Sequence, residues 1–181
     1  MNYIGSKHKL SSFLKKAIKD TVGSDLSQLV FCDLFAGTGI VGRNFKPLVK
    51  QIIANDVEFY SYVLNRNYIG NYTPLKTQNH LAFLNNLEGK EGFIFHHYCE
   101  NGNEERLYFS SENGKKNDGI RQQIEAWKRT KEISEDAYYF LLASLIESAD
   151  KESAQAKVEE ACKKMLANQI METYHFTIEN Y

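Results

Sequence analysis

The stretch that decides the fold is residues 33–42, which read Asp33-Leu34-Phe35-Ala36-Gly37-Thr38-Gly39-Ile40-Val41-Gly42. An apolar run over residues 29–35 predicts a buried strand, and a helical pattern begins at Ile40. Glycines 37 and 39 permit backbone angles closed to other residues and let a ligand approach the main chain. Open α/β sheets bind nucleotides at such loops, where a parallel strand ends. The stretch predicts a ligand-binding loop, and the alternative is a tight strand–helix turn that holds no ligand.

The spacing of the glycines is compatible with more than one nucleotide ligand. Gly37, Gly39 and Gly42 satisfy G-x-G-x-x-G, the dinucleotide pattern, and Asp56 follows at the distance of an acid that binds a ribose hydroxyl. Asp33 would place a negative charge beside a pyrophosphate, but it suits a ligand with a cationic end, such as the amino group of S-adenosylmethionine. A phosphate-binding loop is excluded, because residues 43 and 44 are Arg and Asn instead of Lys and Ser or Thr. An NAD-binding oxidoreductase remains an alternative that rests on the glycine spacing alone.

The flanking sequence predicts a parallel βαβ unit followed by helices. Apolar periodicity predicts a first helix to about residue 21, a strand over 51–54 and a helix over 58–69. Residues 71–118 look irregular, with an exposed loop over 100–105. Helices are predicted near 120–131 and 134–150, and the chain is expected to end in a helix near 154–166 and a strand over 174–178.

Length and composition fit a globular chain. There are 181 residues, of which 43% are hydrophobic and 25% charged, and no run of apolar residues is long enough for a membrane span. The three cysteines (Cys32, Cys99 and Cys162) are widely spaced, and the first residues lack a secretion signal, so we expect reduced thiols in a cytoplasmic protein. Residues 1–90 carry 11 basic and 6 acidic side chains, and residues 91–181 carry 11 and 17. The basic first half is compatible with an anionic partner such as nucleic acid, and an unevenly charged surface explains it equally.

Three segments together resemble a known family. Tyr3-Ile4-Gly5-Ser6-Lys7, then residues 33–42, then Asn55-Asp56-Val57-Glu58 are similar, in this order, to successive motifs of the Dam-like, N(6)-adenine-specific DNA methyltransferases. The similarity continues through residues 60–62, 113–115 and 138–144 and covers about residues 1–150. It implies a partial Rossmann-like, S-adenosylmethionine-dependent α/β fold with a helical insertion. Residues 1–90 would be the incomplete cofactor-binding core, 91–150 the helical insertion and DNA-recognition region, and 151–181 a tail.

The resemblance also implies a function and site residues. The family transfers a methyl group from S-adenosylmethionine to the adenine amino group at specific sites of double-stranded DNA, in restriction-modification systems among others. By position, the cofactor-binding residues would be Tyr3, Gly5, Lys7, Asp33, Phe35, Ala36, Gly37, Gly39, Asp56 and Val57. Asp33 would lie near the methionine moiety, Asp56 would bind the ribose hydroxyls and Val57 would contact the adenine. Arg121, Lys128 and Arg129 fall in the region expected to contact DNA, and they also fit the polar face of an ordinary helix.

One family motif is missing from this sequence. Members carry an Asp/Asn/Ser-Pro-Pro-Tyr/Phe motif, which binds the amino group of the flipped adenine and stacks on its ring. The two prolines here, Pro47 and Pro74, are not adjacent, so no catalytic residue is assigned. We therefore expect a truncated enzyme that is inactive alone or needs a complementing polypeptide. The alternative is a non-catalytic remnant that binds DNA or a partner protein.

Three further segments support weaker predictions. Residues 157–176 resemble the C-terminal helix and strand of the small subunit of phosphoribosylformylglycinamidine synthase, and a terminal cap of the core is the alternative. His96, His97 and Cys99 are close in sequence, but neighbours on an extended chain point to opposite faces, so no metal site is predicted. The aromatic-rich run over residues 138–142 is expected to be helix core, not a base-stacking surface.

Overall fold

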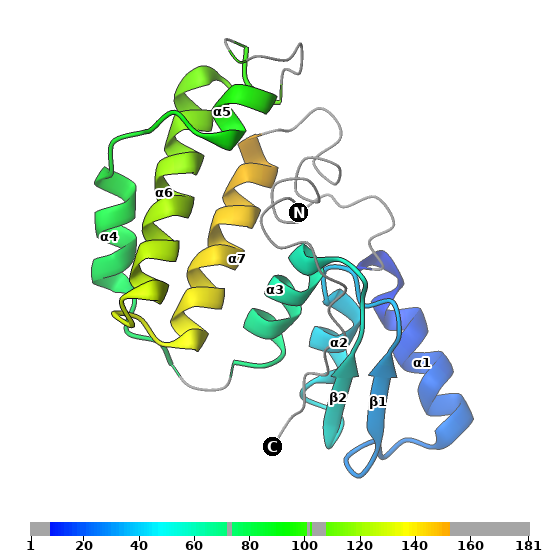
Figure 1. The fold of residues 1–181 in the computed structure, drawn as a ribbon. Helices are drawn as coiled ribbons and strands as arrows, with labels where there is room; N and C mark the ends of the chain where they lie inside the picture. Colours follow the sequence, from blue (N-terminus) through cyan, green and yellow to red (C-terminus); the bar gives the residue numbers. More distant parts are fainter. Residues whose placement is uncertain (1–7, 72–73, 101, 103–107, 153–181) are drawn as a thin grey trace. The chain divides into compact units, whose positions relative to one another are not determined.

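A computed structural model of the chain describes residues 8–71, 74–100, 102 and 108–152. These residues belong to two units, which we call the N-terminal unit (8–71) and the helical unit (74–152) (Figure 1). Within the described part of the chain, no helix is both long and apolar enough to cross a membrane.

The N-terminal unit is built around two parallel strands. In chain order its elements are η1 (His8–Leu10), α1 (Ser11–Val22), β1 (Val30–Asp33), α2 (Ile40–Phe45), β2 (Gln51–Ala54) and α3 (Phe59–Tyr68). The two strands pair in parallel, with Val30 opposite Gln51 and Asp33 opposite Ala54. Helix α2 connects them, so the predicted βαβ unit is confirmed. The glycine-rich loop lies between the end of β1 and the start of α2.

The core of this unit lies against β2 more than against β1. Ile52 and Ala54 of β2 are fully buried, and they share a cluster with Phe45 of α2 and Ile69 at the end of α3. In β1, the ring of Phe31 stacks on that of Phe45 at 4.4 Å between centroids, but Val30 is 51% exposed. Parallel strands are ordinarily buried on both faces, so β1 presents an unusually open strand.

The helical unit consists of four described helices. They are α4 (Gln78–Asn86), α5 (Phe93–Tyr98), α6 (Ser111–Arg129) and α7 (Glu135–Glu152). Figure 1 shows α6 between α4 and α7, and the ring of Trp127 in α6 contacts His80 and Phe83 of α4. The predicted beginning of α7 is confirmed, because the Ser134 hydroxyl accepts the Ala137 N–H at 3.2 Å and caps the helix.

The aromatic-rich run in α7 packs as core, as expected. Its members Tyr138, Tyr139, Leu141 and Leu142 are all buried. A separate cluster joins α5, the segment between α5 and α6, and one residue of α7, and consists of Ile94, Phe95, Tyr98, Cys99, Phe109 and Ala149. Most large apolar side chains of the helical unit are therefore buried.

The prediction that residues 71–118 are irregular is wrong. The segment contains α4, α5 and the first turns of α6, and the two histidines His96 and His97 lie in helix α5 instead of on an extended chain. Glycines 114 and 119 lower intrinsic helix propensity, but each faces another segment closely: a Cβ at Gly114 would lie 2.0 Å from Cys99 Sγ, and one at Gly119 would lie 3.0 Å from the Glu88 carbonyl oxygen. Tertiary packing therefore outweighs local propensity here.

Some expectations fall outside the described residues. These are the first motif over residues 3–7, most of the loop over 100–105, and the helix and strand predicted for residues 154–166 and 174–178. The functional division of the chain at residues 90 and 150 stays a prediction.

Candidate functional site

The ends of the two strands are tied together by main-chain hydrogen bonds. The Asn55 N–H donates to the Asp33 carbonyl at 2.8 Å, and the Ala36 N–H donates to the Asn55 carbonyl at 2.9 Å. The Asn55 side chain adds a third bond, from Nδ2 to the Leu34 carbonyl at 3.0 Å. The structure therefore brings Asp33, the last residue of β1, and Asp56, two residues beyond β2, to the same edge of the sheet.

The loop after β1 requires its two glycines. Gly37 has φ 53° and Gly39 has φ 74°, a left-handed region that other residues adopt only with strain. The Gly39 N–H donates to the Ala36 carbonyl at 2.8 Å and closes the turn. A Cβ at Gly39 would also lie 2.6 Å from Asn65 Oδ1. Residue 39 is thus constrained both by its backbone angle and by a neighbouring side chain.

The Asp56 carboxylate joins the second strand to the glycine loop. Its Oδ2 accepts the Gly37 N–H at 2.8 Å, and its Oδ1 accepts the Glu58 N–H at 3.0 Å. A carboxylate has about four acceptor positions, and these two bonds occupy one on each oxygen. The half-buried carboxylate can therefore hold the loop and still accept hydrogen bonds from the hydroxyl groups of a ligand.

Large apolar side chains beside this loop are exposed. Phe35 is 82% exposed and Val57 is 80% exposed, and Leu34 is exposed as well. Ala36 differs from its neighbours, because its side chain is buried in the core and only its main chain takes part in the loop. The site thus combines acceptor oxygens with uncovered apolar surface, a combination that suits a ligand with both a ribose and a flat apolar ring.

Helix α3 supports the loop through two residues that the sequence analysis did not select. The Ser61 hydroxyl donates to the Gly37 carbonyl at 2.5 Å, and Asn65 Nδ2 donates to the same oxygen at 3.1 Å. Both side chains are fully buried. The available signal is two polar residues four positions apart in a helix whose buried face otherwise carries Tyr60, Val63 and Leu64.

The three predicted DNA-binding residues lie on α6 but differ in their surroundings. The Arg121 guanidinium forms an ion pair with the Glu125 carboxylate, and its side chain is 12% exposed. Lys128 and Arg129 are exposed at the end of the helix, and Lys128 Nζ lies 3.9 Å from the centre of the Tyr138 ring. Among the three, Lys128 and Arg129 are the ones open to a phosphate group.

The Glu125 carboxylate is the centre of a partly buried network. Its Oε1 also accepts the Tyr138 hydroxyl at 2.6 Å. Burial acts to raise the pKa of Glu125, but the hydrogen bonds from Tyr138 and Arg121 outweigh it and leave the pKa below its ordinary value. Burial, together with the hydrogen bond to Glu125, raises the pKa of Tyr138. These groups are neutralised within the unit, which favours a structural role.

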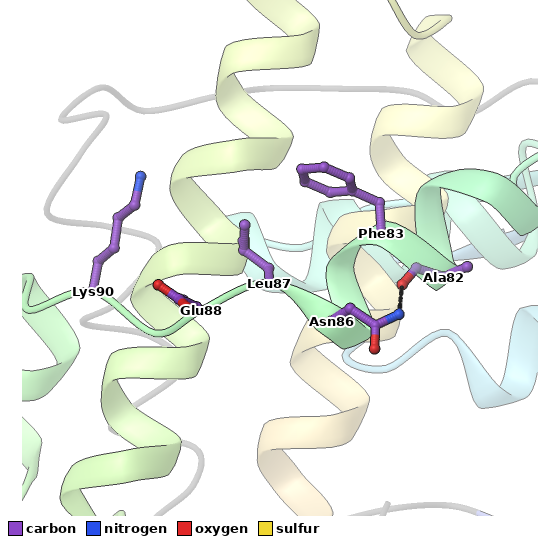
Figure 2. A pocket seen from close by; sticks show the side chains of 6 residues that line it. All are labelled: Ala82, Phe83, Asn86, Leu87, Glu88 and Lys90. Atoms are coloured by element: carbon purple, nitrogen blue, oxygen red, sulfur yellow. Dashed lines mark hydrogen bonds between the residues drawn. The ribbon is translucent and has the colours of Figure 1, made fainter.

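A groove of about 560 Å³ lies in the helical unit, and Figure 2 shows the side chains that line it. Ala82, Phe83 and Asn86 come from α4, and Leu87, Glu88 and Lys90 come from the segment that follows. None of the predicted site residues lines it. Among the described residues, no group of three or more His, Cys, Asp or Glu side chains is arranged to hold a metal ion.

The similarity of the chain to known proteins extends beyond these motifs. The chain is 59% identical over 167 residues to the type II methyltransferase M.NlaIII of Neisseria lactamica, an alignment that covers 92% of this chain and 50% of that protein. It is 38% identical to the type II methyltransferase M.FokI of Planomicrobium okeanokoites, over 82% of this chain and 24% of that protein. With M.CviAII of Paramecium bursaria Chlorella virus 1, another type II methyltransferase, the identity is 37% over 83% of this chain and 45% of that protein. The chain thus spans half or less of the length of these relatives.

No solved structure shows a significant match to the chain. The model of the D12 class N6 adenine-specific DNA methyltransferase family matches residues 3–181. The match continues past residue 150, where the resemblance was expected to stop, and nothing supports a separate relation of the tail to the formylglycinamidine synthase subunit. Because the family model covers nearly the whole sequence, the chain belongs to the D12 class N6 adenine-specific DNA methyltransferase family.

Proposed function

We propose that this chain supplies the cofactor-binding part of a site-specific DNA adenine methyltransferase. The reaction is methyl transfer from S-adenosylmethionine to the adenine amino group of double-stranded DNA. The observation that carries the proposal is the Asp56 carboxylate, which holds the Gly37 N–H at the joined ends of β1 and β2 and keeps acceptor positions in reserve. This arrangement, in a chain of this family, fits a nucleoside ligand.

The residues at the loop fit S-adenosylmethionine by their chemistry. Asp56 would accept hydrogen bonds from the ribose hydroxyls, and the exposed Val57 and Phe35 would cover apolar parts of the ligand. Asp33, with Ala36, Gly37 and Gly39, would surround the methionine end, where a carboxylate complements the amino group. Tyr3, Gly5 and Lys7 would border the pocket, and they lie outside the described residues. When bound, the cofactor supplies a methyl group activated on a sulfonium.

An NAD-binding oxidoreductase is the less favoured reading. The glycine spacing permits it, but the Asp33 carboxylate would lie near a pyrophosphate and repel it. Family membership also favours a methyl donor over a hydride donor.

The chemistry of the adenine requires residues that this sequence does not contain. With Pro47 and Pro74 apart, the Pro-Pro-aromatic motif is missing from the 181 residues. We propose that a complementing polypeptide supplies it and extends the sheet beside β1, whose Val30 is half exposed. The chain alone is then a partial Rossmann-like fold with a helical insertion over residues 91–150, inactive in the cytoplasm until completed. A non-catalytic remnant that binds DNA or a partner remains the alternative.

Calorimetry with S-adenosylmethionine tests the cofactor proposal. The wild-type chain is expected to bind it, and NAD is expected not to bind. Asp56→Ala should weaken binding at least about thirtyfold, because it removes a carboxylate that forms charge-assisted hydrogen bonds. Asp25→Ala is the matched control, since Asp25 also accepts the N–H two residues further on but is exposed and distant in sequence from the loop. Equal affinity of the wild-type chain and Asp56→Ala would refute the assignment.

Transfer of a labelled methyl group to DNA tests the need for a complementing polypeptide. The isolated chain is expected to give none, and turnover by it would overturn that proposal. DNA binding is tested separately by a titration at several salt concentrations. Replacing Lys128 and Arg129 by Ala should reduce the slope of log affinity against log salt by about 2, because each phosphate contact contributes about 0.9. Lys16→Ala, on exposed α1, should leave the slope unchanged.

A further inference from the structure

The carbonyl group of Gly37 receives two side-chain donors from one helix. Ser61 Oγ and Asn65 Nδ2 both bond to it, and Asn65 Nδ2 also lies 2.8 Å from the Ser61 carbonyl and 3.2 Å from Ser61 Oγ. The pair is therefore a small connected network whose outer end is the glycine loop. We call Ser61 and Asn65 the loop clamp.

The loop clamp and Asp56 act on opposite sides of one residue. Asp56 fixes the N–H of Gly37, and the loop clamp fixes its carbonyl oxygen. These two groups belong to the peptide planes before and after the Gly37 Cα, so holding both fixes the φ and ψ angles of that residue. Glycine loses more backbone conformational entropy than any other residue when it becomes ordered. If Gly37 is already ordered in the free protein, ligand binding does not have to provide that free energy.

Asn65 also has a feature that stability does not explain. Its Oδ1 is buried without a hydrogen-bond partner among the described residues, and it faces Gly39 across the space that a Cβ would occupy. A buried acceptor without a donor is unfavourable for folding. An apolar side chain of the same shape would avoid that cost, so the amide at residue 65 is better explained by its bond to the loop.

We propose that Ser61 and Asn65 are positioning residues that preorganise the glycine loop for S-adenosylmethionine. The inference rests on the proposed function, because it assigns the purpose of the clamp to that ligand. Neither side chain is itself assigned a contact with the cofactor; both act through the Gly37 carbonyl.

Because one carbonyl has two donors, the double substitution is predicted to affect binding more than the two single substitutions combined. In Ser61→Ala the carbonyl keeps the Asn65 donor, and in Asn65→Leu it keeps the Ser61 donor, so each change alone should weaken S-adenosylmethionine binding about threefold. With both replaced, the half-buried carbonyl has no side-chain donor, and the penalty for an unmade bond exceeds that for a weakened one. The double variant should lose about fiftyfold, more than the product of the single effects.

Calorimetry on the wild-type chain and these three variants provides the test. Ser144→Ala is the matched control, because the Ser144 hydroxyl likewise donates to a main-chain carbonyl, that of Phe140 at 2.8 Å, in helix α7. The control should bind like the wild type. A double variant that binds like the wild type, or whose loss is no larger than the product of the single losses, would overturn the proposal.

Hydrogen exchange of the cofactor-free chain separates the clamp from the cofactor assignment. The Gly37 and Gly39 amides should exchange at least about tenfold faster in the double variant, while amides in α1 and α6 keep their wild-type rates. If the wild-type chain does not bind S-adenosylmethionine, the proposed function fails, and faster exchange at the loop alone would still support the clamp. Unchanged exchange at both glycines overturns it. Ser61→Ala, the smaller change, supplies the same measurement if the double variant does not fold.

Discussion

The two units differ in what they do with large apolar side chains. The described residues include nine exposed large hydrophobics, and eight of them belong to the N-terminal unit: Leu10, Phe13, Val22, Leu29, Val30, Leu34, Phe35 and Val57. The helical unit contributes only Phe83 to this set. Exposed apolar residues that cluster mark places where something else binds. The helical unit thus buries most of its large apolar side chains, and the N-terminal unit leaves apolar surface exposed on α1, on β1 and, at Leu34, Phe35 and Val57, beside its loop.

The units also use buried polar groups differently. In the helical unit, the Asp118 carboxylate accepts the N–H groups of Ile94 and Phe95 at 3.0 and 2.8 Å and so caps α5. In the N-terminal unit, the loop clamp directs its donors to a loop that carries no core side chain beyond Ala36. One arrangement stabilises a helix, and the other fixes a binding loop. Substitutions in the two units should therefore differ in whether they affect folding or binding.

The largest contrast is expected from the same kind of truncation in the two units. Trp127→Ala removes a buried ring that contacts two side chains of α4, and should lower the free energy of unfolding of the helical unit by about 3–5 kcal/mol. Phe35→Ala removes an exposed ring and should change stability by less than about 0.5 kcal/mol. Urea denaturation followed by circular dichroism measures both. Comparable losses from the two changes would contradict the comparison.

A smaller effect is expected at a glycine inside the helical unit. Gly114→Ala gains helix propensity, but its Cβ would overlap Cys99 Sγ, so the net loss should be about 2 kcal/mol. Trp127 is the single tryptophan, and its fluorescence reports unfolding of this unit. Adding Cys99→Ala removes the overlapping sulfur and should restore most of the loss relative to Cys99→Ala alone. If the double variant is as unstable as the sum of the two single changes, the contact with Cys99 is not the cause.

The strands and the loop were predictable from the sequence because their signals are local. The runs over 29–35 and 51–54 are short and mostly apolar and contain β1 and β2, with Asp33 at the end of β1 and Asn55-Asp56 directly after β2. Parallel pairing then brings Asp33 and Asp56 to one edge without further information. The fold class of the N-terminal unit follows from these few residues.

The missed features depend on contacts between distant segments. Ser61 and Asn65 bond to a main-chain carbonyl 24 and 28 residues earlier, and no pattern of side chains reveals such a partner. Similarly, Gly114 and Gly119 look like helix breakers until their close neighbours Cys99 and Glu88 are known. In both cases the residue type is required by a contact with a distant segment, either a close steric contact or a hydrogen bond to a main-chain group. The periodicity of the sequence carries no information about such contacts.

The cap of α5 should show a loss close to that at Gly114. Asp118→Ala leaves two buried N–H groups without their acceptor, and should destabilise the helical unit by about 2 kcal/mol. Burial raises the pKa of Asp118 above its ordinary value, so this carboxyl adds stability at low pH that declines as the pH rises through its raised pKa. Binding of S-adenosylmethionine by the N-terminal unit should be unaffected under conditions where the variant is folded. Loss of binding at full stability would mean that the two units are coupled.

The smallest effect is expected from Glu125, whose pKa is lowered in the folded protein by hydrogen bonds from Tyr138 and Arg121 that outweigh burial. For an acid with a lowered folded pKa, stability is fully present above the unfolded value near 4.5 and is lost as the pH falls through the folded value. Glu125→Gln should therefore be less stable than the wild type by about 1 kcal/mol at pH 7, and the difference should shrink below about pH 4.5. Tyr138→Phe removes one donor and so raises the folded pKa of Glu125 toward the unfolded value, and the acid-induced loss of stability should therefore be smaller than in the wild type and end at a higher pH. Trp127 fluorescence across a pH series measures all three proteins, and a difference between wild type and Glu125→Gln that grows toward low pH would show that the carboxylate is not stabilised in its ionised form.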